Sequence, residues 1–215
     1  MAHPLDMAQR LRADAVTEQN RPKLRSLVDA CHENKVNLLL YMSRQFADNA
    51  PEWELYNKEV LQTPNFGGYS REPKQTAYVV CWNSAWRDFC LHNLGKLMDE
   101  FGNDGWYLDG PEWPMACDNR HHGCGYEAPD GTLRPTWDIF GTREFMKRLY
   151  VLTRQRKTEG QLNIHNSTVM TIPTLGWGTS TWSGEQIDAA AMNIGDARSY
   201  LTSGNIIMGR FAKAA

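Results

Sequence analysis

The sequence lacks long apolar runs, basic blocks and the dense, even cysteine pattern of disulfide-rich domains. No apolar run approaches the ~18 residues that a membrane-spanning helix needs. Charges of both signs are interleaved along the chain and sum to −2, so no basic patch predicts a nucleic-acid or membrane partner. The five cysteines are odd in number and widely spaced, which argues against a disulfide framework.

The first residues, MAHPLDMAQRLRADAV, have neither the apolar core nor the cleavage site of a secretory signal. We therefore expect either an intracellular chain or a piece of a longer, exported protein. Residues 1–20 are expected to be flexible or peripheral. With 215 residues, 41% of them hydrophobic and 22% charged, the chain can bury the core of one compact domain.

Tryptophan is abundant, with eight residues in the chain, several of them in segments that the pattern predicts to be loops. Aromatic rings outside a core often form platforms for the apolar faces of sugar rings. The alternative is that each ring packs against the inner side of a long loop. The candidates for sugar contact are Trp82, Trp113, Trp177 and Trp182.

Helix-like and short apolar segments alternate along the chain. Helical spacing of apolar residues predicts helices over 22–34, 84–101 and 142–157. Short apolar runs predict buried strands over 36–42, 105–108 and 161–165, and less distinctly over 77–81 and 175–182. This alternation is typical of parallel strands joined by helical crossovers.

The predicted loops after the strands are long, whereas the turns from helix to strand are short. This asymmetry is typical of a (β/α) barrel of the TIM type, whose active site is built from the loops after the strands. A doubly wound sheet would give the same alternation, but the sequence has no glycine-rich phosphate loop. We therefore interpret residues 1–215 as a single catalytic-type α/β domain, a TIM-type barrel that is either complete or lacks strands at its ends.

Polar groups stand at the ends of successive predicted strands: Asp109, then His165 and Asn166, then Glu185. Cleavage of a glycosidic bond needs two carboxyl groups, one to protonate the leaving oxygen and one to attack or to activate water. Asp109 and Glu185 are the favoured pair, and Glu112, three residues after Asp109, is the competitor of Glu185. The alternative for Asp109 is that an Asp-Gly pair after a strand forms a simple turn. His165 and Asn166 are expected to hold substrate hydroxyls, and a hydrogen-bonded histidine in the core is the alternative for His165.

Two cysteines and two histidines lie within eight residues: Cys117, His121, His122 and Cys124. Thiolates and imidazoles are zinc ligands, but this spacing is not that of a standard zinc finger or ribbon. A disulfide between the two cysteines and an unligated loop are the alternatives. Cys31, Cys81 and Cys90 are expected to be small buried hydrophobes.

Several runs resemble a known family: GWYLDG at 105–110, the stretch from Cys117 to Tyr126, REFMKRLY at 143–150 and WSGEQ at 182–186. Over roughly residues 35–210 the chain resembles the catalytic barrel of glycoside hydrolases near family 123, and more closely the uncharacterised bacterial proteins grouped with them. The resemblance implies a TIM barrel that acts on glycans, with N-acetylated hexosamines as a candidate substrate.

The chain departs from that family at two points. The family places adjacent Asp and Glu residues at the strand end, whereas Gly110 follows Asp109 here. This difference favours Asp109 as a nucleophile or base with a distant acid, for which Glu185 is the candidate. The family also carries a β-rich domain before its barrel, which this chain lacks, so a fragment of a longer protein is expected.

Together these observations predict a glycosidase that cleaves O-glycosidic bonds with two carboxylates and needs no cofactor. Its partner would be a carbohydrate substrate. Two alternatives stay open at this point. One is a carbohydrate-binding barrel without turnover, and the other is a metal-dependent hydrolase that uses the Cys117–Cys124 loop.

Overall fold

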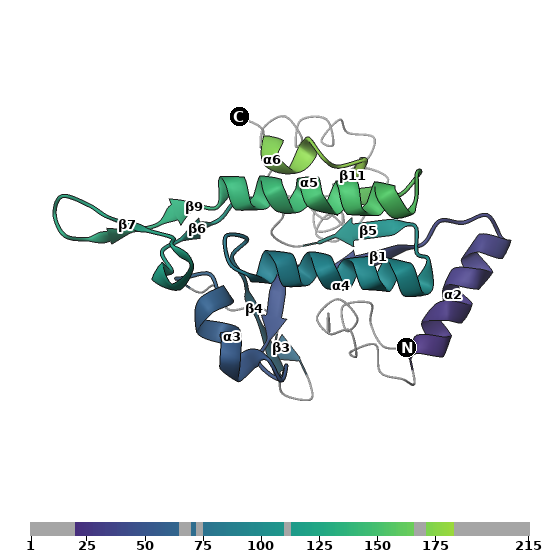
Figure 1. Ribbon diagram of the computed structural model, residues 1–215, viewed down its shortest axis with the longest axis horizontal. Helices are drawn as coiled ribbons and strands as arrows, with labels where there is room; N and C mark the ends of the chain where they lie inside the picture. The colour runs from purple at the N-terminus through teal and green to yellow at the C-terminus, as the bar shows by residue number, and fades with distance from the viewer. Residues whose placement is uncertain (1–19, 65–69, 72–74, 110–112, 166–170, 183–215) are drawn as a thin grey trace, which may run out of the picture.

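The computed structural model describes residues 20–64, 70–71, 75–109, 113–165 and 171–182 (Figure 1). In this part of the chain the fold is mixed α/β, and its centre is a four-stranded parallel sheet. The strands lie in the order β1 (Leu39–Met42), β5 (Gly105–Leu108), β10 (Gln161–His165) and β11 (Ser180–Trp182). Each new strand is therefore added at the same edge of the sheet.

Two long helices, α4 (Trp86–Phe101) and α5 (Ile139–Arg156), supply the crossovers into β5 and β10. They lie side by side on one side of the sheet (Figure 1). They run in the same direction, because the ion pairs Asp88–Arg148 and Asp99–Arg156 join them in the same order along both helices. Neighbouring crossover helices thus cover one face of the sheet.

The core lies between these helices and the sheet. The ring of Trp82 stacks on Phe145 of α5 with centroids 3.8 Å apart and planes 8° apart. Most of the other buried core side chains come from the two helices and the central strands, among them Met42, Cys90, Leu94, Met98, Phe101, Trp106, Leu108, Met146, Leu149, Leu162 and Ile164. The apolar stripes that predict α4 and α5 therefore face the sheet.

Short turns join each helix to the following strand. Gly102 ends α4 with a φ of 72°, a left-handed conformation that glycine adopts without steric cost. Gly105 starts β5 with a φ of 146°, and a Cβ there would lie 1.9 Å from the carbonyl oxygen of Gln161. Glycine at position 105 therefore allows the close approach of β5 and β10.

The long connections after β1 and β5 fold into a side lobe of small antiparallel sheets, at the bottom and on the left of Figure 1 respectively. The connection after β1 contains β2 (Gln45–Ala47), α3 (Trp53–Val60), β3 (Ser70–Arg71) and β4 (Gln75–Val79). The connection after β5 contains β6 (Ala116–Cys117), η1 (Arg120–His122), β7 (Tyr126–Glu127), β8 (Leu133–Arg134) and β9 (Thr136–Trp137). Outside the lobe, α2 (Arg21–Glu33) packs on α4, and α6 (Ile172–Leu175) packs on α5.

The structure confirms the strands predicted at 105–108 and 161–165 and shortens the first strand to Leu39–Met42. The run predicted less distinctly at 77–81 is a strand over Gln75–Val79, and it lies in the connection after β1, where it pairs antiparallel with β2 and β3. The segment 175–182 is a strand only from Ser180, since Pro173 starts the short helix α6.

The described residues form no closed barrel, so the observed fold class is mixed α/β with a parallel sheet. Among these residues, no helix combines the length and the hydrophobicity that crossing a membrane requires.

Candidate functional site

Asp109 stands at the carboxyl end of β5. Its backbone N–H donates to the carbonyl of Met42 at 2.9 Å, which extends the pairing of β1 and β5 by one residue. His165 is the last residue of the neighbouring strand β10, and Tyr41 is the penultimate residue of β1. Because the three strands are parallel, these residues meet at one edge of the sheet.

Both oxygens of the Asp109 carboxylate are held by neighbouring side chains. The hydroxyl of Tyr41 donates to Oδ2 at 2.6 Å, and Nδ1 of His165 lies 2.7 Å from Oδ1. The His165 side chain is 7% exposed, whereas that of Asp109 is 32% exposed. The carboxylate is therefore fixed in orientation and still reachable from solvent.

Aromatic rings surround this pair. Tyr107 lies beside both Tyr41 and His165, with ring centroids 5.7 Å and 6.0 Å apart. Trp182, in β11, meets His165 edge-on at 4.4 Å and is 39% exposed. The strand ends thus present an oriented carboxylate, an imidazole and an accessible indole.

The structure brings together three of the residues that the sequence singles out: Asp109, His165 and Trp182. Glu112, Asn166 and Glu185 lie outside the described residues. Tyr41 was not predicted, although its strand was. It reaches the site because it pairs with Tyr107 in the β1–β5 register, and paired residues on adjacent parallel strands share a face.

The remaining tryptophans of the predicted sugar site lie elsewhere. Trp82 is wrong as a sugar contact, because it is 1% exposed and its ring stacks on Phe145 within the core. Trp177 is partly buried and packs against the core and Tyr150 of α5. Trp113 is partly buried in the loop before β6, where its carbonyl accepts a hydrogen bond from Arg44.

A buried ion pair fixes the base of the side lobe. Arg44 and Asp138 form a salt bridge with side chains 1% and 0% exposed. Arg44 also donates to the carbonyl of Val80 at 2.6 Å, and its guanidinium lies over the ring of Trp82. The pair therefore ties the segment after β1 to the start of α5.

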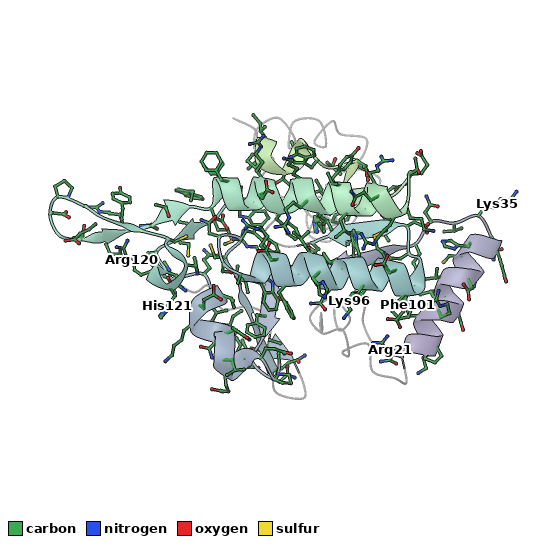
Figure 2. The ribbon with its side chains drawn as sticks, in the orientation of Figure 1. Arg21, Lys35, Lys96, Phe101, Arg120 and His121 are labelled. Atoms are coloured by element: carbon green, nitrogen blue, oxygen red, sulfur yellow. The ribbon has the colours of Figure 1, made fainter. Side chains whose placement is uncertain are left out.

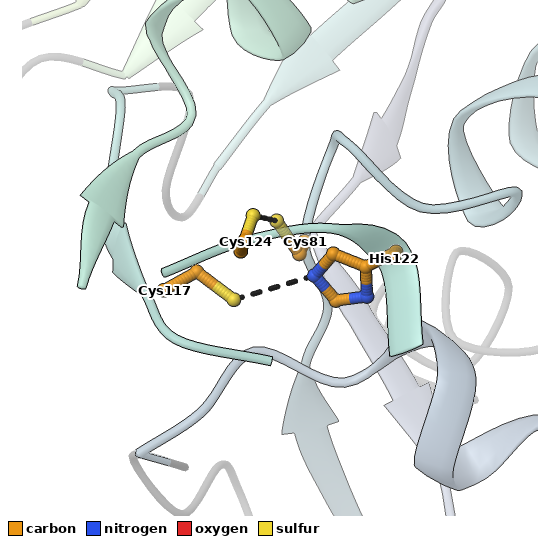
Figure 3. A group of neighbouring side chains, drawn as sticks. All are labelled: Cys81, Cys117, His122 and Cys124. Atoms are coloured by element: carbon orange, nitrogen blue, oxygen red, sulfur yellow. Dashed lines mark hydrogen bonds between the residues drawn. The ribbon is translucent and has the colours of Figure 1, made fainter. Parts of the chain in front are cut away.

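Four potential metal ligands converge in the side lobe: Cys81, Cys117, His122 and Cys124 (Figure 3). Their ligand atoms all lie within 4.8 Å of one another. The sulfur atoms of Cys81 and Cys124 are 3.8 Å apart, and Sγ of Cys117 lies 3.3 Å from Nε2 of His122. All three cysteines are free thiols.

This set differs from the predicted one by one member. His121 is exposed on η1 and is not among the four residues that converge (Figure 2). Cys81, which the sequence pattern predicts to be a small buried hydrophobe, is the fourth member of the cluster. Gly123, with a φ of 78°, lets the chain reverse after His122 and return Cys124 to the cluster.

The close packing of the thiols shifts their acidity in opposite directions. The Cys81 thiol, with His122, lowers the pKa of Cys117 to about 4 despite its burial. The Cys117 sulfur and burial in turn raise the pKa of Cys81. Burial alone would lower the pKa of His122, but the contacts with Cys117 and the Glu59 carbonyl raise it. The cluster thus stabilises a negative charge on sulfur.

The sequence matches no protein-family model and no curated protein. The structure resembles part of a Paenibacillus cycloisomaltooligosaccharide glucanotransferase, solved in complex with cycloisomaltoheptaose: the TM-score is 0.53, the identity 12%, and the match covers 80% of this chain and 27% of that one. It also resembles part of α-L-fucosidase isoenzyme 2 from Paenibacillus thiaminolyticus. The TM-score is 0.54, the identity is 14%, and the match covers 74% of this chain and 25% of the fucosidase.

These likenesses concern the fold. The chain shares the fold of a part of two carbohydrate-active enzymes and spans about a quarter of the length of each.

Proposed function

We propose that this chain is part of a glycoside hydrolase-type enzyme that cleaves O-glycosidic bonds, with Asp109 as its nucleophile. One observation carries the proposal. At the carboxyl edge of a parallel sheet, both oxygens of an accessible carboxylate accept hydrogen bonds, from Tyr41 and His165. Active sites of (β/α) barrels are built at this edge.

The winding of the sheet supports a barrel rather than an open, doubly wound sheet. The parallel strands follow one another in the order of the sequence, and α4 and α5 lie side by side on one side of them. A doubly wound sheet reverses its strand order and covers both faces with helices. In our proposal, the sheet from β1 to β11 is one sector of a TIM-type barrel.

Asp109 is placed as an acceptor of hydrogen bonds, which suits a nucleophile better than a general acid. In a retaining glycosidase the nucleophile attacks the anomeric carbon while a second carboxylic acid protonates the leaving oxygen. Tyr41 and His165 would orient the attacking carboxylate, and Trp182 would offer its exposed indole to a sugar ring.

For the general acid we propose Glu185, which follows the end of β11 by three residues in the sequence. Glu112 is the competing candidate, since it follows Asp109 by the same number of residues. The resemblance to glycoside hydrolases near family 123 and the fold of the two carbohydrate-active enzymes both support a glycan substrate.

Turnover of aryl glycosides and oligosaccharides by the wild-type chain and by Asp109→Asn tests the proposal. We expect Asp109→Asn to lose roughly 10³-fold or more of kcat/KM while glycan binding persists. Asp130→Asn, on the exposed β7–β8 hairpin, is the control and should retain full activity. Unchanged turnover in Asp109→Asn would contradict the proposal. Glycan binding without any turnover by the wild type would instead identify a binding-only barrel.

A further inference from the structure

Two ligand–ligand distances in the Cys/His cluster match those of a tetrahedral metal site. With Zn–S bonds of ~2.3 Å and a Zn–N bond of ~2.0–2.1 Å, the edges of a zinc tetrahedron measure ~3.8 Å between sulfurs and ~3.5 Å between sulfur and nitrogen. The Cys81–Cys124 sulfur distance is 3.8 Å, and the Cys117–His122 distance is 3.3 Å. A disulfide would need ~2.05 Å. These two distances match edges of a zinc tetrahedron, and no two of the four ligand atoms are more than 4.8 Å apart, so one ion could contact all four after small side-chain shifts.

Outer contacts orient the ligand atoms. Nδ1 of His122 lies 2.5 Å from the carbonyl oxygen of Glu59, so Nδ1 carries the proton and Nε2 presents its lone pair to the sulfur cluster. The side-chain amide of Asn83 donates to Sγ of Cys124 at 3.3 Å. Hydrogen bonds of this kind around the ligands are typical of metal sites.

The cluster is enclosed by protein. Cys81, Cys117 and Cys124 are at most 1% exposed, and His122 is partly buried. Four protein ligands complete a tetrahedron, which is typical of structural zinc, whereas catalytic zinc keeps one position for water or substrate. Three thiolates and one imidazole also select zinc over magnesium or calcium, which prefer oxygen ligands.

We propose that Cys81, Cys117, His122 and Cys124 bind one structural zinc ion. The ligands belong to two connections, Cys81 to the one after β1 and the other three to the one after β5. Through Glu59, His122 also reaches α3. The zinc would therefore fasten the loop that follows Asp109 to the segment before α4 and hold the side lobe as one unit beside the carboxyl edge of the sheet.

Elemental analysis of the purified chain, expressed with zinc and handled under reducing conditions, tests the site. The wild type should contain about one zinc per chain. His121→Ala and His122→Ala form a matched pair, and only His122→Ala should lose zinc, by about tenfold or more. Cys81→Ser should likewise lose zinc, whereas Cys31→Ser, on α2, should retain it. Full zinc in Cys81→Ser or in His122→Ala would overturn the proposed ligand set.

A second measurement needs no ligand variant and so does not depend on how such variants fold. Titration of the zinc-depleted wild-type chain with Co²⁺ should saturate at about one equivalent and give the tetrahedral d–d and thiolate-to-cobalt absorption bands of a three-thiolate site. Zinc should then displace the cobalt and bleach both sets of bands. A wild type that binds neither zinc nor cobalt, or a cobalt spectrum without thiolate bands, would overturn the proposal.

Discussion

Substitution of Asp138 by Asn tests how the two connections are held together. Asp138 is fully buried, and its carboxylate accepts hydrogen bonds from groups in four separate segments. Arg44 and the backbone N–H of Trp82, at 3.1 Å, donate to Oδ2. The N–H of Met115, at 2.7 Å, and the hydroxyl of Thr142, at 3.3 Å, donate to Oδ1. An amide keeps the shape of the side chain but loses the charge and one acceptor.

The expected cost follows from what remains unpaired. Loss of one member of a buried ion pair costs about 3–5 kcal/mol, because the other charge stays buried without compensation. Arg44 would still donate to the carbonyls of Val80, at 2.6 Å, and Trp113, at 3.3 Å. These acceptors place the expected cost at the lower end, about 3 kcal/mol, which corresponds to a drop of about 1–2 M in the urea midpoint.

Urea unfolding followed by tryptophan fluorescence and far-ultraviolet circular dichroism measures this cost. Asp99→Asn is the matched control, because Asp99 pairs with Arg156 at an exposed position on the surface of α4. Exposed pairs contribute little to stability, so the control midpoint should equal that of the wild type. An Asp138→Asn midpoint equal to that of the control would refute the conclusion that the buried Arg44–Asp138 ion pair stabilises the fold.

Two further predictions concern the sheet and its turns. Gly105→Ala would place a Cβ 1.9 Å from the Gln161 carbonyl oxygen, so we expect loss of the β5–β10 pairing, and a wild-type unfolding midpoint would contradict this. Burial alone would raise the pKa of Asp104, but the N–H of Leu38, His32 and Lys157 together hold it below its usual 3.8. Its contribution to stability is therefore fully present above pH 3.8 and is lost as the pH falls through the lower folded-state pKa. Asp104→Asn should be less stable than the wild type at pH 7, and the difference in unfolding free energy should shrink as the pH falls below 3.8. A difference that does not change with pH would contradict the stabilising role of the Asp104 carboxylate.

The strand ends were predictable because strands buried on both faces appear in the sequence as short apolar runs. The apolar runs that end at Leu108 and Ile164 identify β5 and β10, and parallel pairing then brings Asp109 and His165 together. Tyr41 was missed because a tyrosine within an apolar run looks like any other core residue. Its role depends on the register of β1 against β5, which the sequence pattern does not contain.

The Cys/His cluster was predicted only in part. Cys117, His122 and Cys124 are close in sequence, so a local pattern finds them. Cys81 belongs to another connection, and the hydrogen bond from its N–H to the carbonyl of Val60 is one of the tertiary contacts that place it in the cluster. His121 and His122 differ by one position, and the turn of η1 decides which faces inward. Trp82 looked like a loop residue because its burial depends on Phe145, 63 positions later in the chain.

Mass spectrometry of the chain after reaction with activated 2-deoxy-2-fluoro glycosides tests most directly whether Asp109 attacks the anomeric carbon. These compounds trap the covalent glycosyl-enzyme intermediate of a retaining glycosidase. The proposed function predicts that the chain gains one fluoroglycosyl group and that fragmentation places it on Asp109. A label on Glu112, Glu185 or another carboxylate, or turnover without any label on Asp109, would contradict it.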